Sequence, residues 1–192
     1  PAHGAIDGAR RVLAEARVDW SQIDGFIHGT TLATNALIER RGAVVATVTT
    51  KGFRDILEIA YERRYSQYDI NLVKPDLIVP RSSAFTIGGR MDARGRELEP
   101  LEEVSLARLV EELTASGAEA VAICLMHAYA NPVHELRLRD LLQARMPDLV
   151  ISLSHEVSPE AREFDRLSTT IANAYIQPQM ASYLAGFQAR FN

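Results

Sequence analysis

The first quarter of the chain alternates between helical and extended hydrophobic patterns. Apolar residues spaced three and four apart predict an amphipathic helix within residues 6–16. The two-residue apolar run 26–27 predicts a very short strand. Helical spacing resumes over residues 32–41, and Gly42 fits the position just after the end of that helix. The β-branched run AVVATVTT at 43–50 then predicts a buried parallel strand.

The middle of the chain has weaker periodicity. A helix is expected from residue 52 onward. Periodicity fails over residues 61–80, and about twenty residues without regular structure in a compact domain usually form a functional or partner-facing loop. Residues 83–98 alternate between apolar and polar positions around the pair Gly88-Gly89 and the dipeptide Arg94-Gly95, so we predict antiparallel strands with a turn at 92–95.

The second half repeats amphipathic and fully apolar segments. The expected order is helix 101–116, strand 118–126, helix 131–145 and strand 149–153. A long helix follows from residue 158, and Pro178 should kink or break it. Helices that alternate with buried strands indicate βαβ units. We therefore predict an α/β fold: a mostly parallel sheet flanked by helices, with a small β-hairpin insertion.

Composition narrows the class of protein. The 192 residues carry 21 Lys and Arg against 25 Asp and Glu, a formal net charge of −4. This mild acidity, without a basic block, argues against nucleic acid and anionic membranes as partners. No apolar run is long enough to span a bilayer. The single cysteine, Cys124, lies in an apolar run, which predicts an inert buried thiol and a reducing, cytoplasmic location.

Ligands of open α/β sheets bind beyond the carboxyl ends of the strands, so the first polar stretch after each predicted strand is a candidate site. Four stretches qualify, at residues 28–31, 49–52, 127–131 and 154–156. Three of them begin with, or contain, a histidine close to the predicted strand end.

The first stretch combines an imidazole with hydroxyl groups at a helix start. His28 is a candidate catalytic residue, and Gly29 allows close backbone approach to a substrate or phosphate. Thr30 and Thr31 add hydroxyl groups, and Asn35 lies one helical turn further along. The alternative is an N-capped turn with a structural histidine.

The other three stretches supply further candidates. Thr50 and Lys51 are candidate phosphate-binding residues, against the alternative of an N-capped helix with a solvated lysine. His127 is a candidate binding residue, while His155 and Glu156 are candidate catalytic residues. Histidines 28, 127 and 155 with Glu156 could form a metal set, but no local spacing such as HExxH supports one, so we predict no metal site. The charged run 160–166 predicts a solvated helix face.

Three long segments resemble the amino-terminal domain of the hydantoinase A and 5-oxoprolinase family. They are HGTTLATNALIERRGAVVATVTTKGFRDILEIAYERR, GAEAVAICLMHAYANPVHE and ISLSHEVSPEAREFDRLSTTIANAYIQP. The likeness extends from about residue 24 to 178 and is weaker over the middle loop and hairpin. It implies an incomplete actin and sugar-kinase-like (ribonuclease H-like) lobe. Residues 1–178 would form this partial domain, and 179–192 would begin the helix toward a second lobe.

The resemblance also implies a chemistry. Family members use ATP and Mg²⁺ to phosphorylate the carbonyl oxygen of a cyclic amide, such as N-methylhydantoin or 5-oxoproline, before water opens the ring. Related subunits carboxylate acetone or acetophenone. The resemblance implies a hydantoinase B-like partner and an oligomer; a non-catalytic assembly module that docks this partner through residues 61–80 is the alternative.

One departure from the family pattern matters for activity. The family begins with a glycine-rich Asp-x-Gly-Gly-Thr turn that contacts ATP phosphates, and no such segment occurs in this chain. We therefore expect a piece of a longer protein whose sheet lacks edge strands. Alone, it should neither hold ATP tightly nor turn over substrate.

Overall fold

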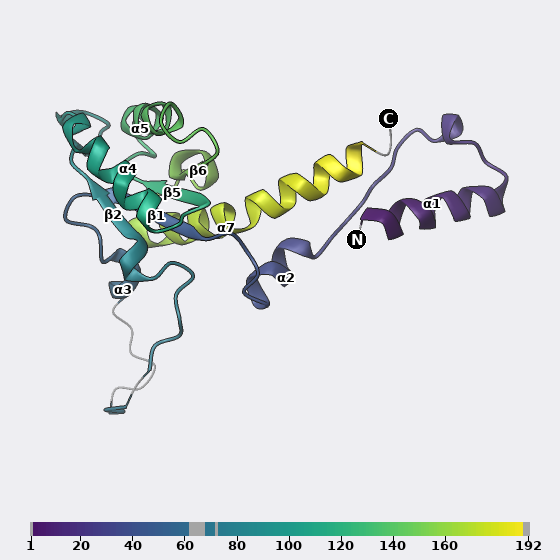
Figure 1. Cartoon of the computed structure of the whole chain (residues 1–192), viewed down its shortest axis with the longest axis horizontal. Helices are drawn as coiled ribbons and strands as arrows, with labels where there is room; N and C mark the ends of the chain where they lie inside the picture. Colours follow the sequence, from purple (N-terminus) through teal and green to yellow (C-terminus); the bar gives the residue numbers. More distant parts are fainter. Residues whose placement is uncertain (1, 62–67, 72, 190–192) are drawn as a thin grey trace.

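Four parallel strands form the main sheet of the computed structural model, which describes residues 2–61, 68–71 and 73–189 (Figure 1). The strands are β1 (Val45–Thr50), β2 (Ala84–Ile87), β5 (Ala120–Cys124) and β6 (Val150–Leu153), in the order β2-β1-β5-β6. All neighbouring pairs are parallel. All four strands therefore end on one side of the sheet, which we call the carboxyl edge, and the segments that follow them lie there.

Helices cover both faces of this sheet. On one face lie α4 (Leu106–Ala115) and α5 (Val133–Gln143), and on the other lies α7 (Glu163–Gln188) with the short helices α2 (Leu32–Ile38) and α3 (Ile56–Ile59). Successive residues of β1 alternate between the two cores: Ala46 and Val48 pack toward α4 and α5, and Val45 packs toward α7. Burial of both faces explains why the strands read as continuous apolar runs.

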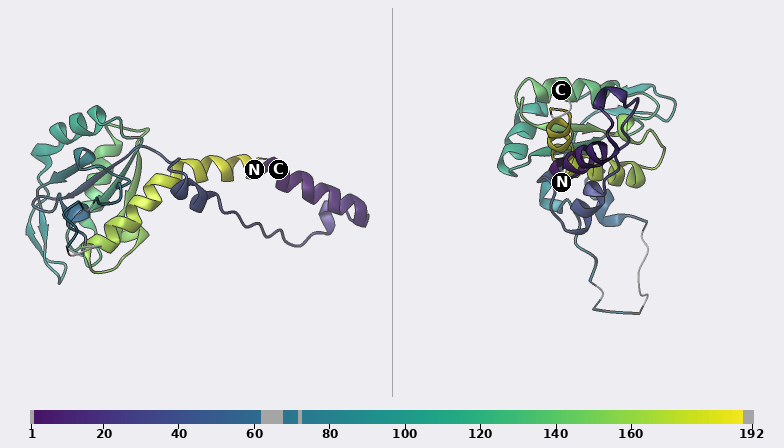
Figure 2. Two further views of the ribbon diagram at one scale, coloured as in Figure 1. Left: turned by 90° about the horizontal axis from the view of Figure 1, so that it is seen from below. Right: turned by 90° about the vertical axis from the view of Figure 1, so that its right-hand side faces the viewer.

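The remaining elements are short or project from this body. They are α1 (Ala2–Ala16), the 3₁₀ turns Trp20–Gln22, Arg81–Ser83 and Glu103–Ser105, the hairpin strands β3 (Arg90–Met91) and β4 (Glu97–Glu99), and α6 (Ser154–Val157). The second half of α7 extends away from the sheet, and α1 lies far from the sheet near the end of α7 (Figure 2). Only Ile6 of the predicted apolar face of α1 is fully buried, at 2% exposure.

The alternating α/β plan is confirmed, but two predicted strands differ. Residues 26–27 form no strand; they lie in an irregular segment, and Ile27 is fully exposed. Residues 84–87 were expected in an antiparallel hairpin but form β2, which pairs in parallel with β1. The antiparallel hairpin is the smaller β3–β4 pair, closed by a bond from Gly95 N–H to the Asp92 carbonyl. Alternation alone does not say which partner a strand chooses.

The helix ends also differ from the expectations. The helix α2 stops at Ile38, and the left-handed residue after it is Arg40 (φ 55°) rather than Gly42. The helix α7 continues through Pro178 as one helix, so of the two outcomes expected at this proline, a kink or a break, the break is wrong. The carbonyl of Tyr175, three residues before this proline, accepts a hydrogen bond from Ala43 N–H at 3.0 Å, which ties the helix to the start of β1.

The middle loop is only partly described. Residues 62–67 and 72 of the expected partner-facing loop 61–80 lie outside the described residues. Its described part is mostly irregular and exposes Tyr68, Ile70 and Val73. No helix within the described residues is both long and apolar enough to cross a membrane.

Gly42 makes a specific prediction about stability. A Cβ atom at this position would overlap the ring of Tyr175, which is 7% exposed in the core beneath α7. We expect Gly42→Ala to lower the free energy of unfolding by about 1–3 kcal/mol, because the ring must move within a packed core. Urea denaturation measures this change. The control is Gly186→Ala, where a Cβ meets nothing within 4 Å; equal stability of the two variants would contradict the packing argument.

Candidate functional site

A buried carboxylate organises the carboxyl edge between β5 and β6. The side chain of Glu135, in the first turn of α5, is 0% exposed. Its Oε1 accepts from Leu125 N–H (2.9 Å) and from Ser154 Oγ (2.6 Å). Its Oε2 contacts the backbone N–H (3.1 Å) and the ring Nδ1 (2.6 Å) of His155. One side chain therefore joins the segments that follow two neighbouring strands.

A buried arginine completes this network from the opposite face of the sheet. The side chain of Arg166, at the start of α7, is also 0% exposed. Its Nε donates to Ser154 Oγ (3.0 Å), and its Nη atoms donate to the carbonyls of Leu125 (2.9 Å) and Glu160 (2.7 Å). Its guanidinium carbon lies 5.4 Å from the ring centre of Tyr129. Ser154 thus bridges two opposite buried charges.

Neither Glu135 nor Arg166 is among the site residues predicted from the sequence. The run 160–166 was expected to be a solvated face, and this is wrong for Arg166, because its guanidinium is bonded inside the molecule. The spacing of residues along the helix could have identified Glu135 as buried. Glu135 lies three and seven positions before the fully buried Leu138 and Leu142, so it belongs to the buried face of α5. A charged residue in phase with core leucines indicates a buried polar contact.

His155 and Glu156 lie on α6, directly after β6. The side chain of His155 is 14% exposed, and its Nε2 lies 4.0 Å from Glu156 Oε1. The Glu156 carboxylate is half exposed and accepts from Arg139 Nη1 at 3.0 Å. The imidazole is therefore held by a buried carboxylate on one side and reaches the molecular surface near a second carboxylate on the other. This arrangement is suited to proton transfer.

Three further predicted residues also lie at the carboxyl edge. Thr50 is buried, and its Oγ accepts from Met126 N–H at 2.9 Å, so it links the ends of β1 and β5. Lys51 follows it and is exposed. His127 has a left-handed backbone (φ 54°), and its Nδ1 lies 3.2 Å from the Tyr129 hydroxyl. Since Tyr129 stacks beneath Arg166, His127 joins the same network as His155.

The first predicted stretch does not join this edge. His28 Nε2 is hydrogen-bonded to the Tyr183 hydroxyl at 2.5 Å, and its ring stacks on Phe187. Tyr183 lies 17 positions after Arg166 on α7, which corresponds to about 25 Å along a helix. Because Arg166 contacts Ser154, next to His155, the two histidines are far apart. The expected convergence of residues 28–31 with His155 is therefore wrong in this structure, since the strand needed to carry them to the edge is absent.

The neighbours of His28 bond locally. Gly29 lies in the same exposed segment. Thr30 Oγ accepts from Leu32 N–H at 3.2 Å, and Asn35 Nδ2 donates to Thr31 Oγ at 3.5 Å. Both contacts are local to the turn before α2, but Thr31, the N-cap residue of this helix, makes no side-chain capping hydrogen bond. The N-capped turn expected as the alternative is therefore not formed either.

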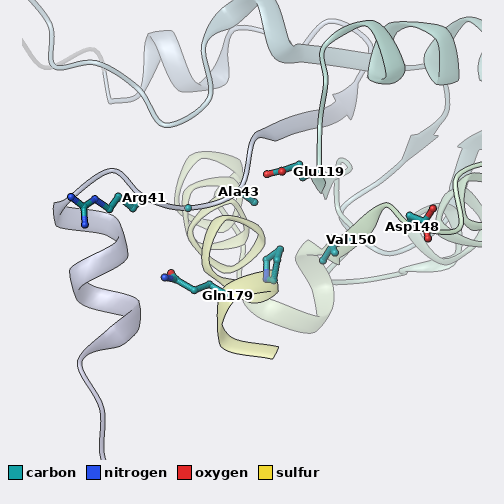
Figure 3. A pocket seen from close by; sticks show the side chains of 8 residues that line it. Arg41, Ala43, Glu119, Asp148, Val150 and Gln179 are labelled. Atoms are coloured by element: carbon teal, nitrogen blue, oxygen red, sulfur yellow. The ribbon is translucent and has the colours of Figure 1, made fainter. Parts of the chain in front are cut away.

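Two other features mark the limits of the site. Within the described ranges, no three His, Cys, Asp or Glu side chains are grouped as a metal site would require. A hollow at the opposite, amino-terminal side of the sheet is lined by charged side chains of both signs, among them Arg41, Glu119 and Asp148 (Figure 3). Arg41 is paired with Glu39, and Glu119 accepts from Val44 N–H. None of the predicted site residues lines this hollow.

The buried thiol expected from the sequence is confirmed. Cys124 ends β5 and is 3% exposed. Burial raises the pKa of its thiol from 9.0 to about 11, and the nearby Arg166 only partly offsets this effect. Because the thiolate is the reactive form, Cys124 is unsuited to act as a nucleophile near neutral pH.

This pKa predicts slow alkylation. At pH 8 a thiol with a pKa of about 11 is ionised to about one part in a thousand. We expect iodoacetamide to leave Cys124 unmodified in the native chain and to modify it fully in urea, as measured by intact mass. The thiolate fraction rises with pH, so native alkylation should accelerate between pH 8 and 10. Fast native alkylation at pH 7 would contradict the burial.

Comparison with known proteins places this geometry in a family. The family model described as "Hydantoinase/oxoprolinase N-terminal region" matches residues 1–146. Caprolactamase subunit alpha of Pseudomonas jessenii is 36% identical over 187 residues, covering 96% of this chain and 26% of the relative. The crystal structure of that ATP-dependent caprolactamase superposes with a TM-score of 0.84 at 34% identity, covering 96% of this chain and 28% of the other.

Two more relatives carry different activities in their names. 5-oxoprolinase 1 of Arabidopsis thaliana is 30% identical over 213 residues, covering 97% of this chain and 17% of the relative. The acetophenone carboxylase gamma subunit of Aromatoleum aromaticum is 27% identical over 172 residues, covering 83% of this chain and 24% of the relative. The chain thus spans about a quarter or less of the length of these relatives. The family match covers far more than half of the 192 residues, and the chain belongs to the hydantoinase/oxoprolinase family, in its amino-terminal region.

Proposed function

We propose that this chain is part of a longer, cytoplasmic, ATP-dependent enzyme that opens a cyclic amide of the N-methylhydantoin or 5-oxoproline type. The γ-phosphoryl group of ATP moves to the carbonyl oxygen and ADP leaves. Water then adds to the activated carbon and the C–N bond breaks, which leaves an acyl phosphate. A second water hydrolyses this acyl phosphate and releases phosphate. An amide carbonyl is a poor electrophile, and its phosphorylation supplies the leaving group that hydrolysis needs.

The observation that carries this proposal is the position of His155. It lies at the carboxyl edge of a parallel sheet, where ligands of such sheets bind, with one ring nitrogen on a buried carboxylate and the other toward the surface. The relatives named after an amide substrate, caprolactamase and 5-oxoprolinase, support the choice of an amide. In this proposal His155 moves the proton of the attacking water, and Glu156 orients that water.

The described residues fit ATP only in part. Lys51 follows β1 and Arg90 follows β2, so both cations lie at the carboxyl edge, where phosphate oxygens would meet them. The buried Arg166 already donates from its Nε and both Nη atoms and is not free for a phosphate. Mg²⁺ would accompany the phosphates of ATP. Thr50 and His127 would line the substrate side.

Several finer expectations remain part of the proposal. Catalytic or binding roles for His28, Gly29, Thr30, Thr31 and Asn35 require this segment to meet the carboxyl edge in the full-length protein. We also propose that residues 1–178 form one domain and that the helix after it leads to a second lobe. The full-length protein would bind a hydantoinase B-like partner and form an oligomer. The names "subunit alpha" and "gamma subunit" among the relatives support partner subunits.

Two other functions remain as second candidates. The acetophenone carboxylase relative favours a ketone carboxylase subunit. In that function the ketone is phosphorylated on the oxygen of its enol form, and the neighbouring carbon is carboxylated. The exposed Tyr68, Ile70 and Val73 favour a surface that docks a partner without catalysis. Assays of ATP hydrolysis with N-methylhydantoin, 5-oxoproline and acetone distinguish the amide-opening enzyme from the ketone carboxylase. Stimulation of ADP formation by a cyclic amide supports the first, and stimulation by acetone supports the second.

The role of His155 is tested in the full-length protein with its partner subunit. We expect His155→Ala to lower substrate-stimulated ADP formation by about 10²–10⁴-fold, because a positioned acid–base group contributes a factor of that size. The control is His134→Ala, which removes a second glutamate-paired histidine, bonded to Glu97 at 2.7 Å, outside the proposed site. This control should stay within a few-fold of the parent.

Size-exclusion chromatography of the same variants distinguishes catalysis from assembly. An intact His155→Ala complex without turnover supports the enzyme. A complex that dissociates while its chemistry persists supports the assembly module and contradicts the proposal. The chain by itself, mixed with ATP and a hydantoin, should release no sustained phosphate; sustained release would show that the rest of the protein is dispensable.

A further inference from the structure

The bonds of Glu135 constrain the proton on His155. Three of its four contacts come from groups that can only donate in this setting. The N–H groups of Leu125 and His155 are donors, and the Ser154 hydroxyl accepts from Arg166 Nε and so has its own proton free for Glu135 Oε1. The fourth contact, from Oε2 to His155 Nδ1 at 2.6 Å, is the one whose direction depends on the charge of the carboxyl group.

The buried arginine determines that charge. A guanidinium stays protonated in proteins, and Arg166 is 0% exposed, so its charge needs a counter-charge within the buried network. Glu135 is the acidic side chain bonded to the same serine hydroxyl. An ionised carboxylate only accepts hydrogen bonds, so Nδ1 of His155 must carry the proton that it shares with Oε2.

We propose that Glu135 is a positioning residue that keeps a proton on Nδ1 of His155, so that the neutral form of the ring has its lone pair on Nε2 and can accept a proton there. This inference rests on the function proposed above for its catalytic role, although the proton position stands on the contacts alone. The Nε2 atom faces Glu156, whose carboxylate is bonded to Arg139, and belongs to a side chain that is 14% exposed. The other charged groups around this ring are Glu135 and, through Ser154, Arg166.

The reaction step follows from this geometry. As water adds to the phosphorylated carbonyl carbon, one of its protons passes to Nε2, and the ring becomes an imidazolium. Glu135 stabilises the positive charge that forms on the ring. The same proton then passes to the amide nitrogen as its C–N bond breaks and the cyclic amide opens. A neutral histidine protonated on Nε2 would point an N–H donor at the water and could not take a proton from that water.

The proton position is measured by long-range ¹H–¹⁵N correlation spectra of the ¹⁵N-labelled chain. These spectra separate the protonated from the unprotonated ring nitrogen, and His155→Ala assigns the signal. We expect neutral His155 to be protonated on Nδ1 in the parent chain. Protonation on Nε2 overturns the inference, and this readout needs no Glu135 variant to fold.

Variants then test whether Glu135 is the cause. Glu135→Gln should move the proton to Nε2 in a large part of the population, because the carboxamide can turn its NH₂ group toward Nδ1. Ser154→Ala removes a different donor from the same carboxylate and should keep the proton on Nδ1. Glu97→Gln, which alters the analogous contact of His134, should also leave the His155 spectrum unchanged. An unchanged His155 in folded Glu135→Gln overturns the inference.

Kinetics of the full-length protein complete the test. We expect Glu135→Gln to lower kcat on the order of 10²–10⁴-fold with KM within a few-fold, and Glu135→Asp to recover part of the loss. Parent kcat in Glu135→Gln, with His155→Ala inactive, overturns the positioning role. Full activity of His155→Ala instead refutes the proposed function, while the proton position remains established by the spectra.

Discussion

The carboxyl edge depends on one buried pair of opposite charges, Glu135 and Arg166, that meet through the hydroxyl of Ser154. Removing either charge from water is costly, and the cost is offset only because nearly every donor and acceptor is used. Glu135 accepts four contacts, and Arg166 donates from its Nε and both Nη atoms. Arg166 comes from α7 and Glu135 from α5, on opposite faces of the sheet. The pair therefore fixes both helix layers to the ends of β5 and β6.

This arrangement connects stability with chemistry. The same carboxylate that pairs with Arg166 also holds the ring of His155, so the histidine that we propose to transfer protons is fixed to the core. His155 lies where a rigid body reaches the surface, whereas His28 lies in an exposed segment that packs on the projecting half of α7. Groups that must transfer protons need fixed geometry, and the carboxyl edge supplies it.

Much of the fold follows from the sequence, and the exceptions have physical causes. The strands β1, β5 and β6 and the helices α4 and α5 are confirmed. Strands buried on both faces read as continuous apolar runs, and helices buried on one face keep a 3.6-residue apolar period. The absent strand at 26–27 had only two apolar residues, too few to select a sheet partner. Pro178 does not end α7, and Gly42 is needed for the approach of Tyr175 rather than for a left-handed turn.

The sequence predicted the candidate residues that follow strands but not the buried residues that hold them in place. His155, Glu156, His127, Thr50 and Lys51 follow strands and lie at the carboxyl edge as the parallel-sheet rule requires. The residues that hold them were missed, because charged side chains in helices are usually solvated. Glu135 in phase with Leu138 and Leu142 was the available signal.

A double-mutant cycle on unfolding tests the central pair most directly. It compares Glu135→Leu, Arg166→Leu and the double variant by urea denaturation. Each single change leaves a buried charge without its partner, whereas the double change removes both. We predict that the double variant is more stable than the sum of the single losses implies, by about 1–3 kcal/mol. Additive losses would show that the two charges do not depend on each other and would contradict this account.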